Sequence, residues 1–138
     1  MGIIEKGLFF WDPHAMRDFQ ENDKYFIVLT DGDSDDDLLV CFSLNTEKRM
    51  DKYNVLCNKK SAKFILSPEI HKFTFLKKFT SLNLDEPCLY SVKELFENHI
   101  KICEKDKAGI ELVRQIKNCI DNGYLLPKHI FLIKDSFK

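Results

Sequence analysis

The first two-thirds of the chain consists of short aromatic and β-branched runs separated by polar turns. Such runs favour β-strands, because branched and aromatic side chains pack well on a pleated surface. The pattern predicts strands at 24–30, 38–43, 53–57 and 62–66, with further extended pieces at 72–79 and 82–84. Between the first two strands, the Gly and Asp residues of 31–37 predict a hairpin loop. Five or six short strands at this spacing predict a small barrel or a curled sheet.

The hydrophobic pattern changes near residue 90 from strand-like to helical. Ser91 and Glu94 have the spacing of a capping box, in which two side chains bind free N–H groups at a helix start. Helical spacing of apolar residues then predicts a first helix that includes Val92, Leu95, Phe96, His99, Ile100 and Cys103. A second helix is expected over 106–122, with Gly123 as its stop. Pro127 favours a helix over the alternative of a strand at 128–133.

These patterns predict an α+β fold in one domain, residues 1–138. A β-barrel of five to six strands is expected in residues 1–88. A tail of two to three helices, residues 89–138, is expected to pack on the barrel.

Composition agrees with one globular domain. The chain has 138 residues, of which 44% are hydrophobic and 31% charged, so it is long enough to bury one core. The five cysteines lack the C-x-x-C or Cys/His spacing of metal sites, so reduced, buried thiols are expected. The N-terminal stretch lacks the features of a signal peptide, and no apolar run has the length of a membrane span. We therefore expect a cytoplasmic protein with no membrane partner.

Charge is unevenly distributed along the chain. Residues 1–50 hold eleven acidic and five basic residues, a net of −6, whereas 51–82 hold seven basic and two acidic residues, a net of +5. Lysines bind phosphates, and exposed aromatic rings stack on unpaired bases. The middle segment interleaves both kinds of residue: Lys59, Lys60, Lys63, Phe64, Lys72, Phe73, Phe75, Lys77, Lys78 and Phe79. Two interpretations stay open, an anion-binding face or mutual neutralisation of opposite charges in the folded chain. Strand alternation favours burial of Phe73 and Phe75, with the lysines facing water.

The Asp-rich loop matches a calcium site only in part. Asp31, Asp33 and Asp35 have D-x-D-x-D spacing. The Gly and Glu that an EF-hand needs at positions six and twelve are replaced by Asp36 and Phe42. A solvated hairpin tip is therefore favoured, and we expect neither metal nor cofactor. The sequence has no P-loop, G-x-G-x-x-G or G-x-S-x-G motif, which argues against nucleotide-dependent and hydrolase-elbow chemistry.

The order of these segments resembles the MazF/PemK-type toxin family. Lys-Tyr-Phe-Ile-Val-Leu-Thr-Asp, an acidic loop and Leu-Leu-Val-Cys-Phe-Ser are similar to the second and third strands of that family. The stretch from Ser67 to Phe75 is similar to the segment that leads into the last barrel strands. The resemblance covers about residues 20–85 through short apolar motifs. It implies an SH3-like barrel that cuts single-stranded RNA without metal. It also implies a small antitoxin protein as partner. The family relation makes a homodimer an oligomeric form to be tested.

The resemblance also implies a set of site residues. The catalytic Arg of the family corresponds to Lys24, and its Thr or Ser after the third strand corresponds to Ser43 or, with a two-residue slip, to Asn45-Thr46. Lys24 is expected to stabilise the phosphate at the transition state, with Ser43 or Thr46 assisting proton transfer. The RNA backbone is expected to contact His71, Lys72, Lys77 and Lys78.

The chain departs from the family pattern in three ways. Lys24 replaces Arg, and a lysine cannot clamp a phosphate bidentately. Tyr25 stands where the family has a Pro after that Arg. Residues 86–138 are expected to form a helical tail that is longer than that of a typical family member. A catalytically silent barrel that binds RNA or a protein, with its helices as the interaction surface, is therefore the alternative. A metal-dependent nuclease built on the Asp-rich loop lacks a second ligand cluster.

Overall fold

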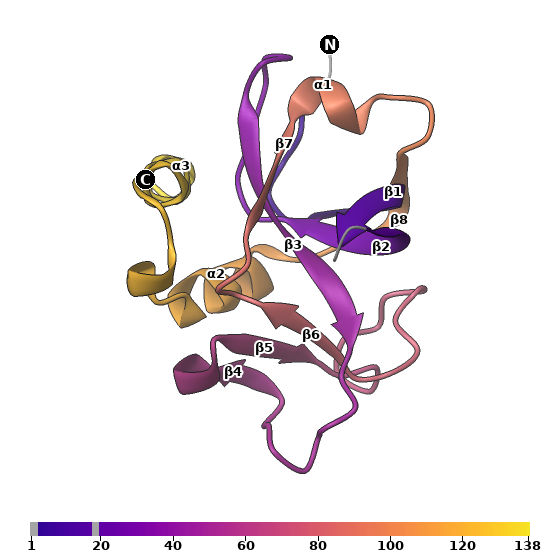
Figure 1. Cartoon of the computed structure of the whole chain (residues 1–138), viewed down its shortest axis with the longest axis vertical. Helices are drawn as coiled ribbons and strands as arrows, with labels where there is room; N and C mark the ends of the chain where they lie inside the picture. Colours follow the sequence, from indigo (N-terminus) through magenta and orange to yellow (C-terminus); the bar gives the residue numbers. More distant parts are fainter. Residues whose placement is uncertain (1–2, 18–19) are drawn as a thin grey trace.

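The computed structural model describes residues 3–17 and 20–138, which form one antiparallel sheet and three α-helices (Figure 1). The strands are β1 (Leu8–Arg17), β2 (Gln20–Val28), β3 (Leu38–Thr46), β4 (Leu56–Asn58), β5 (Lys63–Leu66), β6 (Thr80–Asn83), β7 (Cys88–Ser91) and β8 (Lys101–Lys107). The helices are α1 (Val92–Leu95), α2 (Ile110–Cys119) and α3 (Pro127–Ser136), with short 3₁₀ turns at Lys59–Ser61 and Asn122–Tyr124. The α+β class with C-terminal helices is confirmed.

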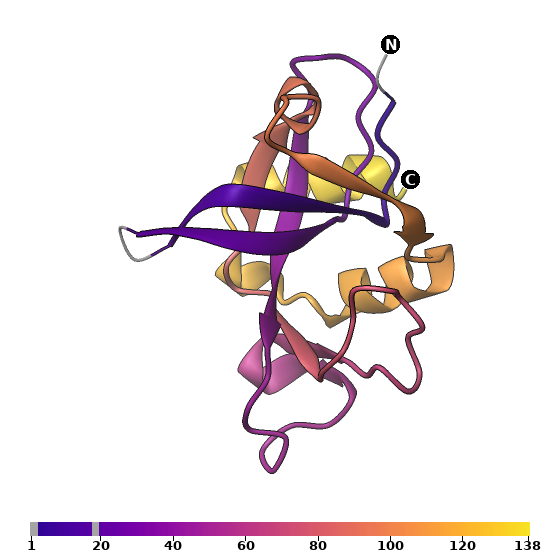
Figure 2. The ribbon, with the colours of Figure 1, turned by 90° about the vertical axis from the view of Figure 1, so that its right-hand side faces the viewer.

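The sheet is strongly twisted and remains open (Figure 2). Its strand order is β4-β5-β6-β3-β2-β1-β8, with β7 beside one half of β3. Among the described strands, β4 and β8 stand at opposite ends of this order and do not pair. The expected closed barrel of five to six strands is therefore wrong, because there are eight strands and no closure. Helix α2 packs against β4 and β5 instead and buries Val113 and Ile116 in the main core.

The central strands are buried on both faces. Along β2, Ile27 contributes to the larger core, whereas Phe26 and Val28 contribute to a smaller core on the opposite face. In β3, Phe42 belongs to the larger core and Cys41 to the smaller one. This burial explains the continuous apolar runs of both strands, since a strand covered on two sides needs no polar alternation.

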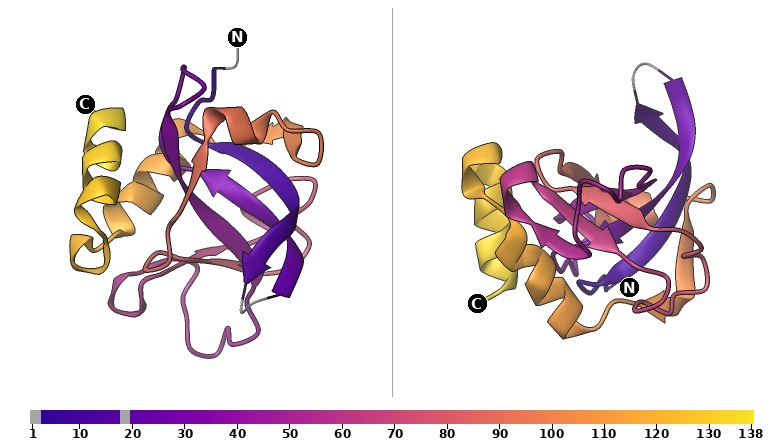
Figure 3. Two further views of the ribbon diagram at one scale, coloured as in Figure 1. Left: turned by 45° about the horizontal axis from the view of Figure 1, so that its top comes forward. Right: turned by 90° about the horizontal axis from the view of Figure 1, so that it is seen from below.

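Figure 3 shows α2 and α3 together on one side of the sheet.

Most of the predicted strands are present. The segments 24–30, 38–43, 62–66 and 82–84 correspond to β2, β3, β5 and β6, whereas 53–57 overlaps the short β4 only at residues 56 and 57. The hairpin is confirmed, because β2 and β3 pair antiparallel on either side of 31–37. The extended piece expected at 72–79 is wrong, because this segment forms turns, one of them closed by the Leu76 N–H donating to the Phe73 carbonyl.

The helical predictions are confirmed in part. The capping box is present: the Glu94 N–H donates to Ser91 Oγ, and the Ser91 N–H donates to Glu94 Oε1. The helix nevertheless ends at Leu95, and 101–107 forms β8 along the edge of β1, where Lys101 pairs with Trp11. Pairing at an open sheet edge has overridden local helix spacing. The second helix covers only Ile110–Cys119 and ends before Gly123, whereas the helix that begins at Pro127 is confirmed.

A disulfide joins the sheet to the tail. Cys57 on β4 is bonded to Cys119 at the end of α2, across 62 residues of sequence. The expectation that all the cysteines are reduced is therefore wrong for this pair, whereas Cys41, Cys88 and Cys103 are free thiols. Packing of α2 on β4 brings the two sulfurs together, and spacing along the chain carries no sign of it. Within the described residues, no helix combines the length and apolarity needed to cross a membrane.

Candidate functional site

Two residues singled out in the sequence line the same small cavity. Lys24 on β2 and Ser43 on β3 face a space of about 190 Å³. The register explains this, because Phe26 pairs with Ser43 and the side chains of Lys24 and Phe26 lie on one face of β2. The other lining residues are Ala15, Phe26, Glu86, Cys88 and Tyr90. The fold therefore brings together a cation, a hydroxyl and a carboxylate from three separate segments.

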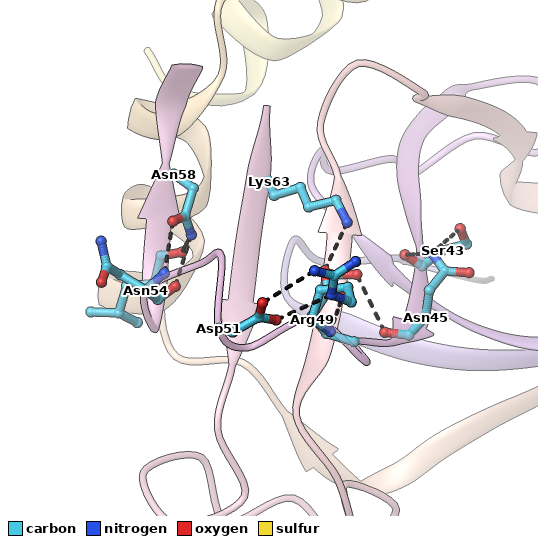
Figure 4. Close-up of polar contacts among 10 residues, drawn as sticks. Ser43, Asn45, Arg49, Asp51, Asn54, Asn58 and Lys63 are labelled. Carbon is cyan, nitrogen blue, oxygen red and sulfur yellow. Dashed lines mark hydrogen bonds and ion pairs between the residues drawn. The ribbon is translucent and has the colours of Figure 1, made fainter. Parts of the chain in front are cut away.

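Asn45 links the cation to the hydroxyl. Lys24 Nζ donates to Asn45 Oδ1 at 2.7 Å. Asn45 Nδ2 donates to Ser43 Oγ at 3.2 Å and to the Ser43 carbonyl at 3.3 Å (Figure 4). An amide has an acceptor at one end and donors at the other, so it orients both neighbours at once. Because Ser43 Oγ accepts from the amide, its own hydrogen remains available as a donor.

A split in the strand pairing opens the sheet beside Ser43. The first part of β3, Leu38–Cys41, pairs with β7, whereas Leu44–Thr46 pairs with β6. Ser43 lies between these two ladders. The turn that connects β6 to β7 passes here and places the exposed carboxylate of Glu86 at the cavity. The split therefore lets a carboxylate from this turn line the same cavity as the Ser43 hydroxyl.

A buried carboxylate supports the far wall of the cavity. Tyr90 Oη donates to Oδ2 of Asp12 at 2.6 Å, and Asp12 is only 5% exposed. Oδ1 of Asp12 accepts the His14 N–H at 2.9 Å and lies 4.0 Å from Nε2 of His99. Burial, together with this hydrogen bond and the Asp12 charge, raises the pKa of Tyr90 well above its ordinary value. The phenol is therefore a permanent donor at neutral pH.

The cysteine in the cavity is chemically quiet. Burial, with a smaller effect of the Asp12 charge, raises the pKa of Cys88 to about 12. A thiol attacks only as its thiolate, which is scarce at neutral pH when the pKa is this high. Thiol chemistry is accordingly disfavoured at this cavity, whose ionisable or hydroxyl side chains also include Lys24, Ser43 and Glu86.

Thr46 lies on the other face of the sheet. Along β3, Ser43 and Asn45 share one face, whereas Thr46 faces a second cavity of about 240 Å³. That cavity also contains Lys77 and Lys78, two of the residues expected to contact RNA. The structure therefore brings Lys24 together with Ser43 and keeps Thr46 apart from both.

His71 has a structural role in its loop. The backbone N–H of Ser67 donates to Nδ1 of His71 at 3.0 Å, which requires an unprotonated nitrogen. Burial lowers the pKa of His71, which keeps the imidazole neutral at pH 7. The ring also lies parallel to that of Phe73. Lys72 beside it is exposed, and neither residue lies at the cavity of Lys24.

The lysines of the basic segment have two kinds of environment. Lys63 is neutralised, because its Nζ lies 2.7 Å from Glu47 Oε1 (Figure 4) and 4.5 Å from the ring centre of Tyr53. Lys60, Lys72, Lys77 and Lys78 are exposed, and none of them forms an ion pair with the residues that the structure describes. Neutralisation therefore accounts for Lys63 only, and Lys77 and Lys78 lie together at the second cavity.

The acidic side chains of the hairpin loop point to different partners. Asp31 pairs with Lys6 at 2.6 Å, whereas Asp37 Oδ2 accepts the N–H groups of Asp33 and Ser34, both at 3.0 Å. These backbone bonds lower the pKa of Asp37. In residues 3–17 and 20–138, no group of three or more metal-ligating side chains is found.

Three groups at the cavity or behind its wall are absent from the sequence prediction. Glu86 and Tyr90 line the cavity and Asp12 accepts a hydrogen bond from Tyr90, but none of the three belongs to a sequence motif. Asn45 is present in the prediction only as the neighbour of Thr46. Comparison with known proteins adds no assignment, because neither the models of protein families nor the curated proteins include a match to this chain.

Proposed function

We propose that this protein is a metal-independent endoribonuclease for single-stranded RNA, related to the MazF/PemK toxins. One observation supports the proposal above the others. Lys24 and Ser43 correspond to the catalytic positions of that family by sequence, and they line one cavity, joined through Asn45. In this proposal the open sheet is a modified form of the SH3-like barrel.

The proposed reaction uses the 2′-OH of the RNA as nucleophile. Its oxygen forms a bond to the adjacent phosphorus while the bond from phosphorus to the 5′ oxygen breaks, which leaves a cyclic phosphate and a 5′-OH. The Lys24 ammonium stabilises the negative charge that develops on the phosphate oxygens. Glu86 accepts the proton of the 2′-OH. Ser43 gives its hydrogen to the leaving 5′ oxygen and is reprotonated from Glu86.

The proposal includes two interactions with other proteins. A small antitoxin is the proposed partner, and a homodimer is the oligomeric form to be tested. Copurification of a small protein expressed from a neighbouring gene tests the first, and light scattering of the purified chain tests the second.

Cleavage of RNA in EDTA tests the proposed activity. Purified protein is incubated with single-stranded RNA, and products are resolved on a denaturing gel. Lys24→Ala and Ser43→Ala should each lower the rate by about 10²-fold or more, because each removes a group that acts in the transition state. Lys24→Arg should keep cleavage, since a guanidinium supplies the same charge with bidentate geometry.

One control separates the site from general effects. Lys128→Ala removes an exposed lysine of α3 that lines neither cavity. This variant should cut RNA as the unchanged protein does. Equal rates for Lys24→Ala and Lys128→Ala would contradict the assignment.

RNA binding without cleavage is the second candidate function. It is supported by the exposed lysines and by the hydrogen bond that holds Lys24 to Asn45. RNA that stays intact but is retained by the protein in a salt-sensitive manner would favour this function. Absence of both cleavage and retention would favour a module that binds a protein.

A further inference from the structure

Four aromatic rings form a nearly parallel ladder beside the basic loop. Tyr25 of β2 stacks on Phe75 with ring centres 4.7 Å apart and an interplanar angle of 10°. Phe75 and Phe73 follow at 6.1 Å and 7°, and Phe73 and His71 at 6.4 Å and 10°. Residues 71, 73 and 75 come from the loop before β6, so the ladder joins this loop to the sheet.

Contacts with a buried ring and a buried carboxylate fix the position of this ladder. Phe9 of β1, which is fully buried, contacts Phe73 and Phe75 with ring centres 4.8 and 4.9 Å away. Thr74, between Phe73 and Phe75 in sequence, donates from its N–H and hydroxyl to the buried carboxylate of Asp106. A loop held by rings on one side and by a carboxylate on the other loses little freedom on binding a ligand.

The end of the ladder lines the second cavity. This space of about 240 Å³ is bounded by Tyr25, Leu44, Thr46, Phe75, Leu76, Lys77, Lys78 and Thr80. Tyr25 is 36% exposed, and both lysines are exposed to solvent. Flat rings next to cations suit a ligand that is flat and apolar at one point and anionic at the next. An unpaired nucleotide has this chemistry.

We propose that this cavity binds one unpaired nucleobase of single-stranded RNA, packed against the Tyr25–Phe75 pair, with the adjoining phosphate held by Lys77 and Lys78. The inference rests on the proposed function for the class of ligand. It adds a base-binding subsite that is separate from the cavity of Lys24, because consecutive residues of β2 point to opposite faces of the sheet. Thr46 then contacts the nucleotide and takes no part in proton transfer.

Binding is measured with an oligonucleotide that cannot be cut. A short 2′-O-methyl RNA lacks the free hydroxyl that the proposed cleavage needs, so its binding is independent of activity. Trp11 is the only tryptophan of the chain and pairs with Tyr25 across β1 and β2, which places both side chains on one face. Titration of the full chain with this oligonucleotide, followed by tryptophan fluorescence, therefore reports on the subsite.

The variants separate ring stacking from other effects. Tyr25→Ala should raise the Kd by about 5- to 150-fold, the range found for loss of one stacked base, whereas Tyr25→Phe should keep the affinity. Tyr124→Ala is the matched control, because Tyr124 is 52% exposed and does not line the cavity. The double variant Lys77→Ala and Lys78→Ala should weaken binding and make it less sensitive to salt.

A second ligand keeps the test valid if Tyr25→Ala does not fold. An abasic oligonucleotide of the same length should bind the unchanged protein more weakly by a similar factor, and a duplex should also bind weakly, because its bases are already stacked. Equal affinity for the abasic and the normal oligonucleotide, equal affinity of Tyr25→Ala and the unchanged protein, or no binding at all would each overturn the subsite. Binding with these properties but without cleavage of normal RNA would overturn the proposed catalysis alone.

Discussion

Nζ of Lys24 and Oδ1 of Asn45 lie 2.7 Å apart across two neighbouring strands, and the same amide donates to Ser43. Asn45→Ala removes this link while leaving the cation and the hydroxyl in place. We expect a loss of cleavage of about 10- to 100-fold, because a misplaced group costs most of its effect at the transition state. Measured kcat should fall more than KM changes. Asn118→Ala, on the exposed surface of α2, is the control and should leave both constants unchanged.

Glu86 is predicted to be the general base. Glu86→Gln keeps the size of the side chain and removes its ability to accept a proton, so the cleavage rate should fall by about 10²- to 10⁴-fold. The neighbouring exposed carboxylate, Asp85, does not line the cavity and provides the control Asp85→Asn. Comparable activity of the Glu86→Gln and Asp85→Asn variants would show that another group takes the proton.

The hydrogen bond from Tyr90 to Asp12 is predicted to stabilise the fold. Tyr90→Phe leaves a buried carboxylate without one of its donors, which should cost about 1–3 kcal/mol of unfolding free energy. Urea unfolding followed by circular dichroism measures this loss. The exposed Tyr124 gives the comparison, and Tyr124→Phe should unfold at the same urea concentration as the unchanged protein.

The disulfide between Cys57 and Cys119 is predicted to hold the tail on the sheet. Cys57→Ala should lower the unfolding free energy by about 2–4 kcal/mol, because a cross-link over 62 residues restricts the unfolded chain. A reductant should lower the stability of the unchanged protein by a similar amount. It should have no effect on the variant, and Cys103→Ala should keep its response to reductant. Thiol counting under denaturing conditions should find three free thiols before reduction and five after it.

His71 is predicted to make stability depend on pH. Burial lowers its pKa below the ordinary value of 6.5, so the unfolded chain takes up a proton more readily than the folded protein. The contribution of the neutral ring is therefore complete above pH 6.5 and is lost as the pH falls through the lowered pKa. Unfolding free energies at pH 7.5 and 5.5 should differ less in His71→Gln than in the unchanged protein. The adjacent variant Lys72→Gln should keep the full difference.

The sequence by itself determined the elements whose signals are local. Continuous apolar runs marked β2 and β3, the Asp-rich loop marked the turn between them, and the Ser91–Glu94 pair and Pro127 marked two helix starts. Lys24 and Ser43 were expected as site residues only through the resemblance to the toxin family, and the register of β2 and β3 then places them at one cavity.

Tertiary structure decided everything that depends on contacts between distant segments. The helical spacing expected as far as Cys103 gives way to β8 from Lys101, because the edge of β1 offers backbone hydrogen bonds that an isolated helix end cannot match. Side chains alternate between the two faces of β3, which separates Thr46 from Ser43. Because β3 pairs first with β7 and then with β6, the turn between those two strands brings Glu86 to the cavity. The Cys57–Cys119 bond follows from the packing of α2 on β4. Local patterns record only the preferences of neighbouring residues, whereas each of these features depends on which buried surfaces meet in the folded chain.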